Sequence, residues 1–458
     1  MTPPDPVRAR GDPGCNTRCT PASETLAPDD PDRLRRRTLE AALAVTVLPS
    51  SSLTFGQTMN TTPKPQGTEI RPFKYRATDA ELADLRSRIK ATKFPNKETV
   101  SDATQGVQLA TAQAIAAYWA TDYDWRKVEA KLDALPQFVT EIDGLDIHFI
   151  HVRSRHANAL PVIVSHGWPG SIIEQMKIID PLTNPTAHGG NATDAFDVVI
   201  PSIPGYGFGA KPTVVGWDTT RIARAWGVLM KRLGYKHYVA QGGDWGAVIT
   251  EQMALQSAPE LLAIHTNMPG AIPNDIHAAA FSGAPAPATL SADEKACYDE
   301  LLFVFSKGIG YAFQMGLRPQ SLYGIADSPV GLATYLLDHD ARSYQLIAGA
   351  FDGKPSGISR DDFLDNITLT WLTNTGVSSG RLYWENKLGF FNAKGITIPV
   401  AVTVFPDELY PAPRSWTQQA FPKLIHYNRA EKGGHFAAWE QPKIFSEEVR
   451  AGFKTLRN

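Results

Sequence analysis

An aspartate enclosed by small residues is the strongest chemical signal in this chain. Asp244 lies in the pentapeptide GGDWG at 242–246, between an apolar run ending near Ala240 and a helical stretch from Ala247. Glycines at 242 and 246 are typical of a strained strand-to-helix turn that presents a nucleophile above a sheet. A carboxylate there can displace a leaving group from an sp³ carbon, after which water attacks the resulting ester carbonyl. The alternative interpretation is a glycine-rich turn whose aspartate caps the helix.

Backbone donors for such an ester are offered by the motif HGWPG at 166–170, which follows the apolar run 162–164. An oxyanion hole needs N–H groups fixed beside the nucleophile, and the amides of Trp168 and Trp245 are the candidates. A tight turn held locally by His166 is the other interpretation of this motif.

A general base is predicted at His435, in the motif GGHF at 433–436. It follows the last predicted strand, in the order nucleophile, acid, histidine, and a neutral imidazole can activate water near the ordinary pKa of histidine. The acid that orients it is expected after the apolar run that ends at Phe405, where Asp407 and Glu408 are adjacent. Spacing alone does not choose between these two carboxylates.

The elements that position these residues are predicted from short apolar runs separated by helical patterns. Runs that are apolar on both faces are typical of parallel strands covered by helices. We therefore predict an α/β fold with a mostly parallel central sheet and helices on both faces. The expected strands are 160–164, 198–200, 238–240, 262–267, 399–405 and 424–427, with an amphipathic helix over 222–233.

Further elements are expected around this sheet. Residues 68–136 form a helical segment, because Leu82, Leu85 and Ile89 recur at helical spacing behind a capping sequence at 78–81. Residues 137–458 form the main domain, which opens with a hairpin over 138–152 whose Asp143-Gly144 turn is of type I′. The strand pattern stops between about 268 and 394, which predicts an inserted helical cap, and a last helix is expected over 442–456.

Composition excludes several classes of protein. With 45 basic and 47 acidic residues, the net charge of −2 gives no broad positive surface for a nucleic-acid partner or an anionic membrane. Three cysteines, two of them at positions 15 and 19, do not build a disulfide framework or a zinc site. We expect no metal and no cofactor, and a neutral small molecule is the expected ligand.

Residues 1–67 are expected to be a leader or a disordered tail. Three arginines at 35–37 precede the apolar run 41–48 and serines at 50–52, which resembles a twin-arginine export signal. A functional leader implies export to the periplasm or the exterior, and otherwise the chain is cytoplasmic; a misplaced start codon is a further interpretation. The run is shorter than the about 20 apolar residues of a membrane span, so no transmembrane segment is expected.

From about Thr68 onward the chain resembles microsomal-type epoxide hydrolases with an epoxide hydrolase N-terminal domain. The resemblance rests on HGWPG, GGDWG and GGHF, on FPDEL at 405–409 and on SPVGLA at 328–333. It implies the α/β-hydrolase fold and conversion of an epoxide and water to a vicinal diol. It also implies that the cap residues Tyr311 and Tyr383 protonate the epoxide oxygen, and that Glu408 is the acid that assists His435.

Two other functions are compatible with parts of this pattern. A haloalkane dehalogenase would form the same ester on Asp244 and bind halide with Trp245, but the tyrosine pair and the N-terminal segment favour the epoxide. A hydrolase-fold binding protein would bind a small molecule tightly without turnover. An ordinary esterase is disfavoured because the one G-x-S-x-G of the chain, at 376–380, lies in the expected helical cap and follows no predicted strand. The natural epoxide, the selectivity, the substrate-binding residues and a homodimeric state stay open.

Overall fold

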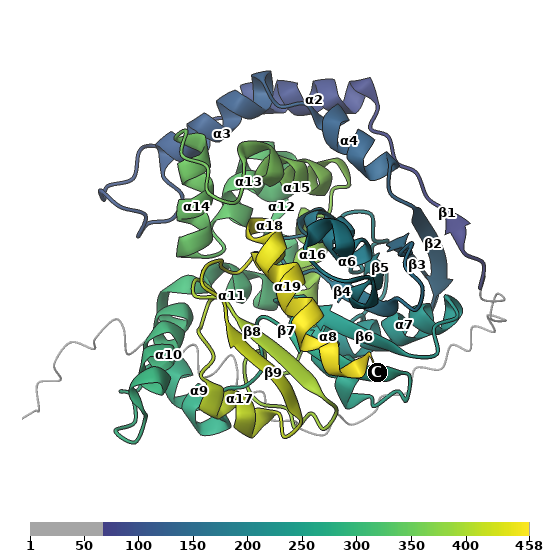
Figure 1. The fold of residues 1–458 in the computed structure, drawn as a ribbon. Helices are drawn as coiled ribbons and strands as arrows, with labels where there is room; N and C mark the ends of the chain where they lie inside the picture. The colour runs from purple at the N-terminus through teal and green to yellow at the C-terminus, as the bar shows by residue number, and fades with distance from the viewer. Residues whose placement is uncertain (1–66, 458) are drawn as a thin grey trace, which may run out of the picture. The chain divides into compact units, whose positions relative to one another are not determined.

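The computed structural model describes residues 67–457. Their central element is a nine-stranded sheet (Figure 1). Its order is β1-β2-β3-β5-β4-β6-β7-β8-β9, antiparallel from β1 to β5 and parallel from β5 to β9. The strands are β1 (Arg71–Pro72), β2 (Gln137–Ile142), β3 (Leu145–Val152), β4 (Leu160–Ser165), β5 (Phe196–Pro201), β6 (Tyr238–Gly242), β7 (Leu261–Thr266), β8 (Val400–Val404) and β9 (Leu424–Arg429).

Burial on both faces explains why the apolar runs become the central strands. Every residue of β6 and β8 is buried, and β4, β5 and β7 each have at most two residues that are partly exposed. The predicted mostly parallel sheet is therefore confirmed. The predicted hairpin is also confirmed, because β2 pairs with β3 and both Asp143 and Gly144 have positive φ, as a type I′ turn requires.

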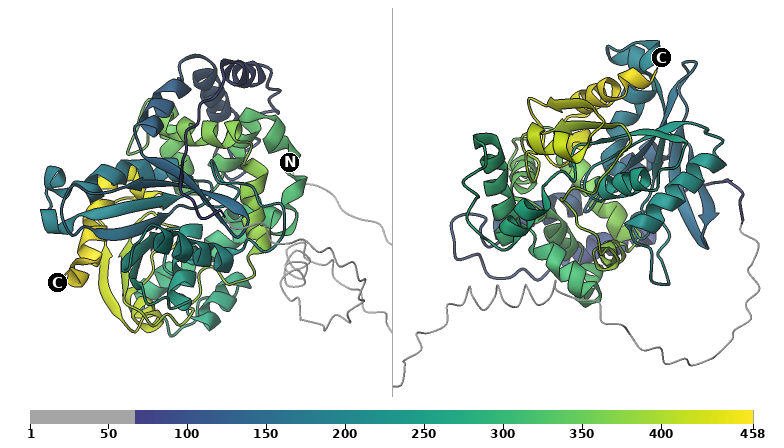
Figure 2. Two further views of the ribbon diagram at one scale, coloured as in Figure 1. Left: turned by 90° about the vertical axis from the view of Figure 1, so that its right-hand side faces the viewer. Right: turned by 90° about the horizontal axis from the view of Figure 1, so that it is seen from below.

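Helices cover both faces of the sheet. On one face α6 packs against α19, and on the other α7 packs against α8 (Figures 1 and 2). The amphipathic pattern predicted around 222–233 is confirmed in α7, which Asp218 caps by accepting a hydrogen bond from the amide of Arg221 at 2.8 Å. The α-helices up to β7 are α2 (Asp79–Lys90), α3 (Leu109–Thr121), α4 (Trp125–Asp133), α5 (Ile172–Gln175), α6 (Ile179–Thr183), α7 (Thr219–Arg232) and α8 (Trp245–Leu255).

The chain between β7 and β8 is helical and forms the cap. Its helices are α9 (Asn274–Phe281), α10 (Ala292–Phe303), α11 (Gly310–Leu317), α12 (Tyr323–Asp327), α13 (Pro329–Leu337), α14 (Ala341–Phe351), α15 (Arg360–Leu372) and α16 (Gly376–Glu385). After β8 follow α17 (Arg414–Ala420), α18 (Ala437–Glu440) and α19 (Pro442–Gly452), the last of which begins at the predicted position.

The N-terminal segment packs on the cap, on the side away from the sheet (Figure 2). The capping box of α2 and the burial of Leu82, Leu85 and Ile89 are as predicted. One part differs from the helical prediction, because β1 pairs with β2 at the edge of the sheet. Two paired residues are too few for an alternating pattern to appear in the sequence.

The leader predicted for residues 1–67 lies outside the described residues except for Gly67, so export stays a prediction. Within residues 67–457, no helix combines the length and the hydrophobicity that crossing a membrane requires.

Candidate active site

Asp244 stands at the sharp turn between β6 and α8, above the carboxyl edge of the parallel strands. Its backbone has φ 50° and ψ −129°, a conformation that costs free energy for any residue with a side chain. The turn needs glycine on both sides: a Cβ at position 242 would overlap the carbonyl of Gly246, and a Cβ at position 246 would overlap the carbonyl of Ser165. The residue types of the motif are therefore explained by close backbone packing that places one buried carboxylate above the edge of the sheet.

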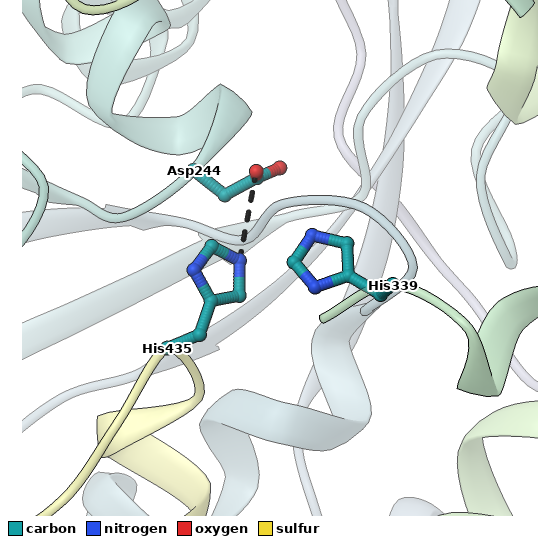
Figure 3. Close-up of side chains that lie close together, drawn as sticks. All are labelled: Asp244, His339 and His435. Carbon is teal, nitrogen blue, oxygen red and sulfur yellow. Dashed lines mark ion pairs between the residues drawn. The ribbon is translucent and has the colours of Figure 1, made fainter. Parts of the chain in front are cut away.

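The carboxylate of Asp244 is held by a backbone amide and faces a histidine. The amide of Trp168 donates to Oδ1 at 2.7 Å, and Nε2 of His435 lies 3.6 Å from Oδ2 (Figure 3). Within residues 67–457 the second predicted donor, the amide of Trp245, makes no hydrogen bond to this carboxylate. That amide begins α8, so the positive end of the helix dipole lies next to Asp244.

Of the two acids after β8, the structure places Glu408 against His435. Its Oε1 accepts from Nδ1 at 2.6 Å, and both side chains are about 1% exposed. Asp407 is 60% exposed and lies 3.8 Å from Arg342. The three predicted residues are thus brought into one line: Asp244 follows β6, His435 follows β9 and Glu408 follows β8.

The electrostatic interactions among Asp244, His435 and Glu408 favour a charged imidazole between two carboxylates in the free protein. Burial opposes a charged imidazole, but the charges and hydrogen bonds of Glu408 and Asp244 outweigh it and raise the pKa of His435 well above its usual value. Burial also opposes ionisation of Asp244, yet His435 and the Trp168 amide hold the pKa of that carboxyl below its usual range. A buried carboxylate that stays ionised is a nucleophile ready at neutral pH.

Both predicted cap tyrosines lie over this site. The ring of Tyr311 stacks on Trp168 at 4.8 Å, and Tyr383 meets Trp245 edge-on at 4.7 Å. Burial, with the nearby charge of Asp244, raises the pKa of both phenols well above its usual value. The two hydroxyl groups therefore remain protonated donors at neutral pH.

His166 belongs to the frame of the site, as its local interpretation proposed. Its Nδ1 contacts the carbonyl of Gly167 at 3.0 Å, and its Nε2 accepts from the amide of Ile203 at 3.1 Å. Burial lowers the pKa of His166 to about 4, so the ring is neutral and fixes the turn that carries Trp168.

Two residues at the site were not predicted. Asn267, directly after β7, contacts Glu408 Oε2 with its Nδ2 at 3.4 Å, and its Oδ1 accepts from Gln241 at 3.2 Å. His339, between α13 and α14, packs its ring 4.4 Å from that of His435 (Figure 3). Asn267 could have been noticed from its place at a strand end, whereas nothing near His339 in the sequence points to this site.

His339 also completes a group of three side chains with metal-ligating atoms. One atom each from Asp244, His339 and His435 lies within 4.8 Å of the others. Such a donor set suits borderline dications such as Zn²⁺, but the ester chemistry uses Asp244 and His435 as nucleophile and base. The expected absence of a metal stays a prediction.

Comparisons with known proteins cover both parts of the chain. Residues 70–175 match the family model described as epoxide hydrolase N terminus, and residues 161–296 match the alpha/beta hydrolase fold. Among curated proteins, "Putative epoxide hydrolase" of Stigmatella aurantiaca is 47% identical over 85% of this chain and 86% of its own length. "Epoxide hydrolase 1" of Oryctolagus cuniculus is 34% identical over 84% of this chain and 90% of its own length.

The solved structures that resemble this chain are also epoxide hydrolases. Juvenile hormone epoxide hydrolase from the silkworm Bombyx mori superposes with a TM-score of 0.74 at 29% identity, covering 86% of this chain and 96% of that one. Epoxide hydrolase of Aspergillus niger has a TM-score of 0.71 at 27% identity, covering 85% and 97%. Because the matches extend over the N-terminal helices, the cap and the sheet that carries Asp244, the chain belongs to the microsomal-type epoxide hydrolases of the α/β-hydrolase fold.

Proposed function

We propose that this epoxide hydrolase forms a covalent ester on Asp244 and releases a vicinal diol when water cleaves that ester. One observation supports the proposal above all others. A buried carboxylate at a strained turn faces a histidine whose other ring nitrogen is bound by a buried acid.

In the first step an oxygen of Asp244 attacks an epoxide carbon, and the bond between that carbon and the ring oxygen breaks. The departing oxygen would be a poorly stabilised alkoxide, so it needs a proton or strong hydrogen bonds. Tyr311 and Tyr383, both protonated and both packed over the tryptophans beside Asp244, are the proposed donors.

In the second step His435 removes a proton from water, whose oxygen bonds to Cγ of the Asp244 ester. The Trp168 amide stabilises the charge that develops on Oδ1. Esterification has by then removed the charge of Asp244, one of the two carboxylates that raise the pKa of His435. The imidazolium therefore first gives its extra proton to the phenolate that the first step leaves, and the neutral ring is then the proton acceptor for water.

Oxygen-18 labelling tests the ester directly. With enzyme in excess over an aryl epoxide in ¹⁸O water, the first diol should gain no label, and the peptide that contains Asp244 should gain one heavy oxygen. Direct attack of water on the epoxide would instead label the first diol and leave that peptide unchanged.

Asp244→Ala supplies the matching control, and it should abolish diol formation while the protein stays folded. Offering 1-chlorobutane in parallel tests the dehalogenase alternative. Chloride release with inert epoxides would contradict the proposed specificity and make Trp245 the residue to examine.

A further inference from the structure

A small cavity lies beside Asp244 and His435, and the cap tyrosines Tyr311 and Tyr383 are not among the residues that line it. The space open to the centre of a water molecule is about 20 Å³. One water needs about 10–15 Å³ by the same measure. Its polar walls come from Glu174, Gln175, Gln241, Asp244, Asn267 and His435.

Three of these walls carry buried oxygens that bind no protein donor. They are Oε2 of Glu174, Oε1 of Gln175 and Oε1 of Gln241, and this holds among all residues that the structure describes. Buried polar atoms are almost always hydrogen-bonded to protein or to ordered water. A polar space of this size with three such oxygens fits a bound water, adjacent to both the nucleophile and the base.

One carboxyl oxygen of Glu174 accepts hydrogen bonds from the protein, and the other has no protein partner among the described residues. Its Oε1 accepts from the amide of Gly167 at 3.3 Å and from Nε2 of Gln175 at 2.8 Å. Its Oε2 occupies the place that a Cβ at position 170 would take, so Gly170 leaves room for this acid. Burial raises the pKa of Glu174 to about 8, which lets Oε2 keep a proton near neutral pH and donate it to a water.

We propose that Glu174 positions the hydrolytic water against the ester on Asp244. This inference rests on the proposed ester mechanism. The water oxygen is held by Oε2 of Glu174, and His435 takes one of its protons as the oxygen bonds to Cγ. The bond from Cγ to the diol oxygen then breaks, and the proton on His435 passes to that oxygen. The carboxyl group of Asp244 then gives its proton to His435, which restores the ion pair of the free protein. One water is consumed, and Glu174 is unchanged.

The two half-reactions distinguish this role from a merely structural one. In Glu174→Leu the group that donates to the water is removed, whereas in Glu174→Gln an amide N–H replaces the carboxyl O–H and the carbonyl still accepts from Gly167. We expect ester hydrolysis to slow by about 10–100-fold in Glu174→Leu, the range that misplacement of a reacting group causes, and to recover most of the wild-type rate in Glu174→Gln. The rate of ester formation should stay within about threefold, since the cavity lies beside the nucleophile, away from the tyrosines.

Rapid quench followed by intact-mass spectrometry measures both rates, because the ester adds the mass of the epoxide to the protein. In the steady state a larger share of Glu174→Leu than of the wild type should be present as the ester. Asp365→Asn is the matched control, as it removes another buried acid whose pKa is raised, to about 7, in a cap helix outside this cavity. Both half-reactions should be unchanged in that variant.

Unchanged ester hydrolysis in Glu174→Leu, or an equal fall in both rates, would overturn the proposal. If that variant does not fold, Glu174→Asp, which withdraws the carboxyl by one methylene, is judged by the same two rates. A wild-type enzyme that consumes epoxide without any trapped ester would remove the basis of this role and also contradict the mechanism on Asp244.

Discussion

The role of His435 as a base depends on which acid binds the Nδ1 atom of its ring. Two adjacent acids follow β8, and only Glu408 bonds to Nδ1, at 2.6 Å, while Asp407 is exposed. The acid keeps the ring oriented and stabilises its charged form after it has taken the proton from water.

The first prediction concerns this choice of acid. Glu408→Gln should lower the rate of ester hydrolysis by about 10²–10⁴-fold, because the imidazole loses its charged partner. Asp407→Asn should remain within about twofold of the wild type, as its carboxylate is solvated. Diol formation under substrate saturation measures both variants, and equal losses would contradict the assignment of Glu408.

The second prediction concerns the phenols. Tyr383→Phe and Tyr311→Phe should each slow ester formation by about 10-fold or more, since each removes one donor to the departing oxygen. The rate of ester hydrolysis should change much less. Tyr323, which is 68% exposed, supplies the control Tyr323→Phe with both rates unchanged. A hydrolysis step that slows while ester formation is normal would argue against the proposed donors.

The third prediction is a difference in pH dependence between the two steps. Hydrolysis needs neutral His435, and the pKa of His435 in the ester is lower than in the free enzyme because the charge of Asp244 is gone. The hydrolysis rate should therefore fall as the pH drops below that lowered pKa, and ester should accumulate in acid. Quenched single turnovers across pH measure this, and a hydrolysis rate that rises in acid would contradict the base role.

At this scale Asp244, His435 and the adjacent acids Asp407 and Glu408 were predicted from short motifs with a chemical reason for each residue type. Tyr311, Tyr383 and the choice of Glu408 were predicted from the family resemblance alone. Glu174 and His339 could not be predicted, because their roles depend on contacts with distant segments, whereas the place of Asn267 directly after a strand could have indicated it. His339, for example, meets His435 across 96 residues of chain, and its own surroundings in the sequence carry no motif.

At the scale of the elements, the strands were predictable because parallel strands are buried on both faces and appear as continuous apolar runs. The two-residue strand β1 was not, since pairing at the sheet edge leaves no periodicity in so short a segment. The sharp turn between β6 and α8 could be predicted only in part. Its glycines indicated a tight turn, but only the structure identifies the carbonyls that exclude a Cβ.

The fourth prediction tests that packing. Gly246→Ala should sharply lower the yield of folded protein or the melting temperature, because its Cβ would overlap the Ser165 carbonyl and neither backbone can move freely. Gly227→Ala in α7 is the matched control, as the nearest atom to its Cβ is Tyr238 Oη at 3.8 Å. That variant should gain about 0.5–1 kcal/mol in the free energy of unfolding.

At the scale of the whole molecule, the N-terminal helices and the cap share one interface. Trp119 donates to Thr368 Oγ1 at 3.0 Å, and the hydroxyl of Tyr123 donates to Asp365 at 2.8 Å. Burial raises the pKa of Asp365 to about 7, so this buried acid is costly to ionise. A contact of this kind follows from the arrangement of helices in space, which helical periodicity alone does not predict.

The fifth prediction follows from the sign of that shift. Between the ordinary carboxyl pKa near 4 and about 7, the folded state binds the proton of Asp365 more tightly than the unfolded state does. This group's contribution to stability is thus present in acid and is lost as the pH rises through about 7. Asp365→Asn should raise the melting temperature at pH 8 relative to the wild type, with a smaller gain or none at pH 5. Thermal melts at the two pH values check this, and a gain confined to pH 5 would contradict it.

The interface between the N-terminal helices and the cap also bears on how the chain folds while it is being made. Trp119 and Thr368 are separated by 249 residues, so α3 leaves the ribosome long before its partner helix exists. At a synthesis rate of about 5–20 residues per second, the cap residues that cover α2 to α4 are made about 12–50 s after these helices. During that interval Leu85, Ile115 and Trp119, which are buried in the folded protein, lack the cover that the cap later provides. Slower synthesis lengthens this exposure, and so the yield of soluble enzyme should depend on chaperones that hold the first helices until the cap is complete.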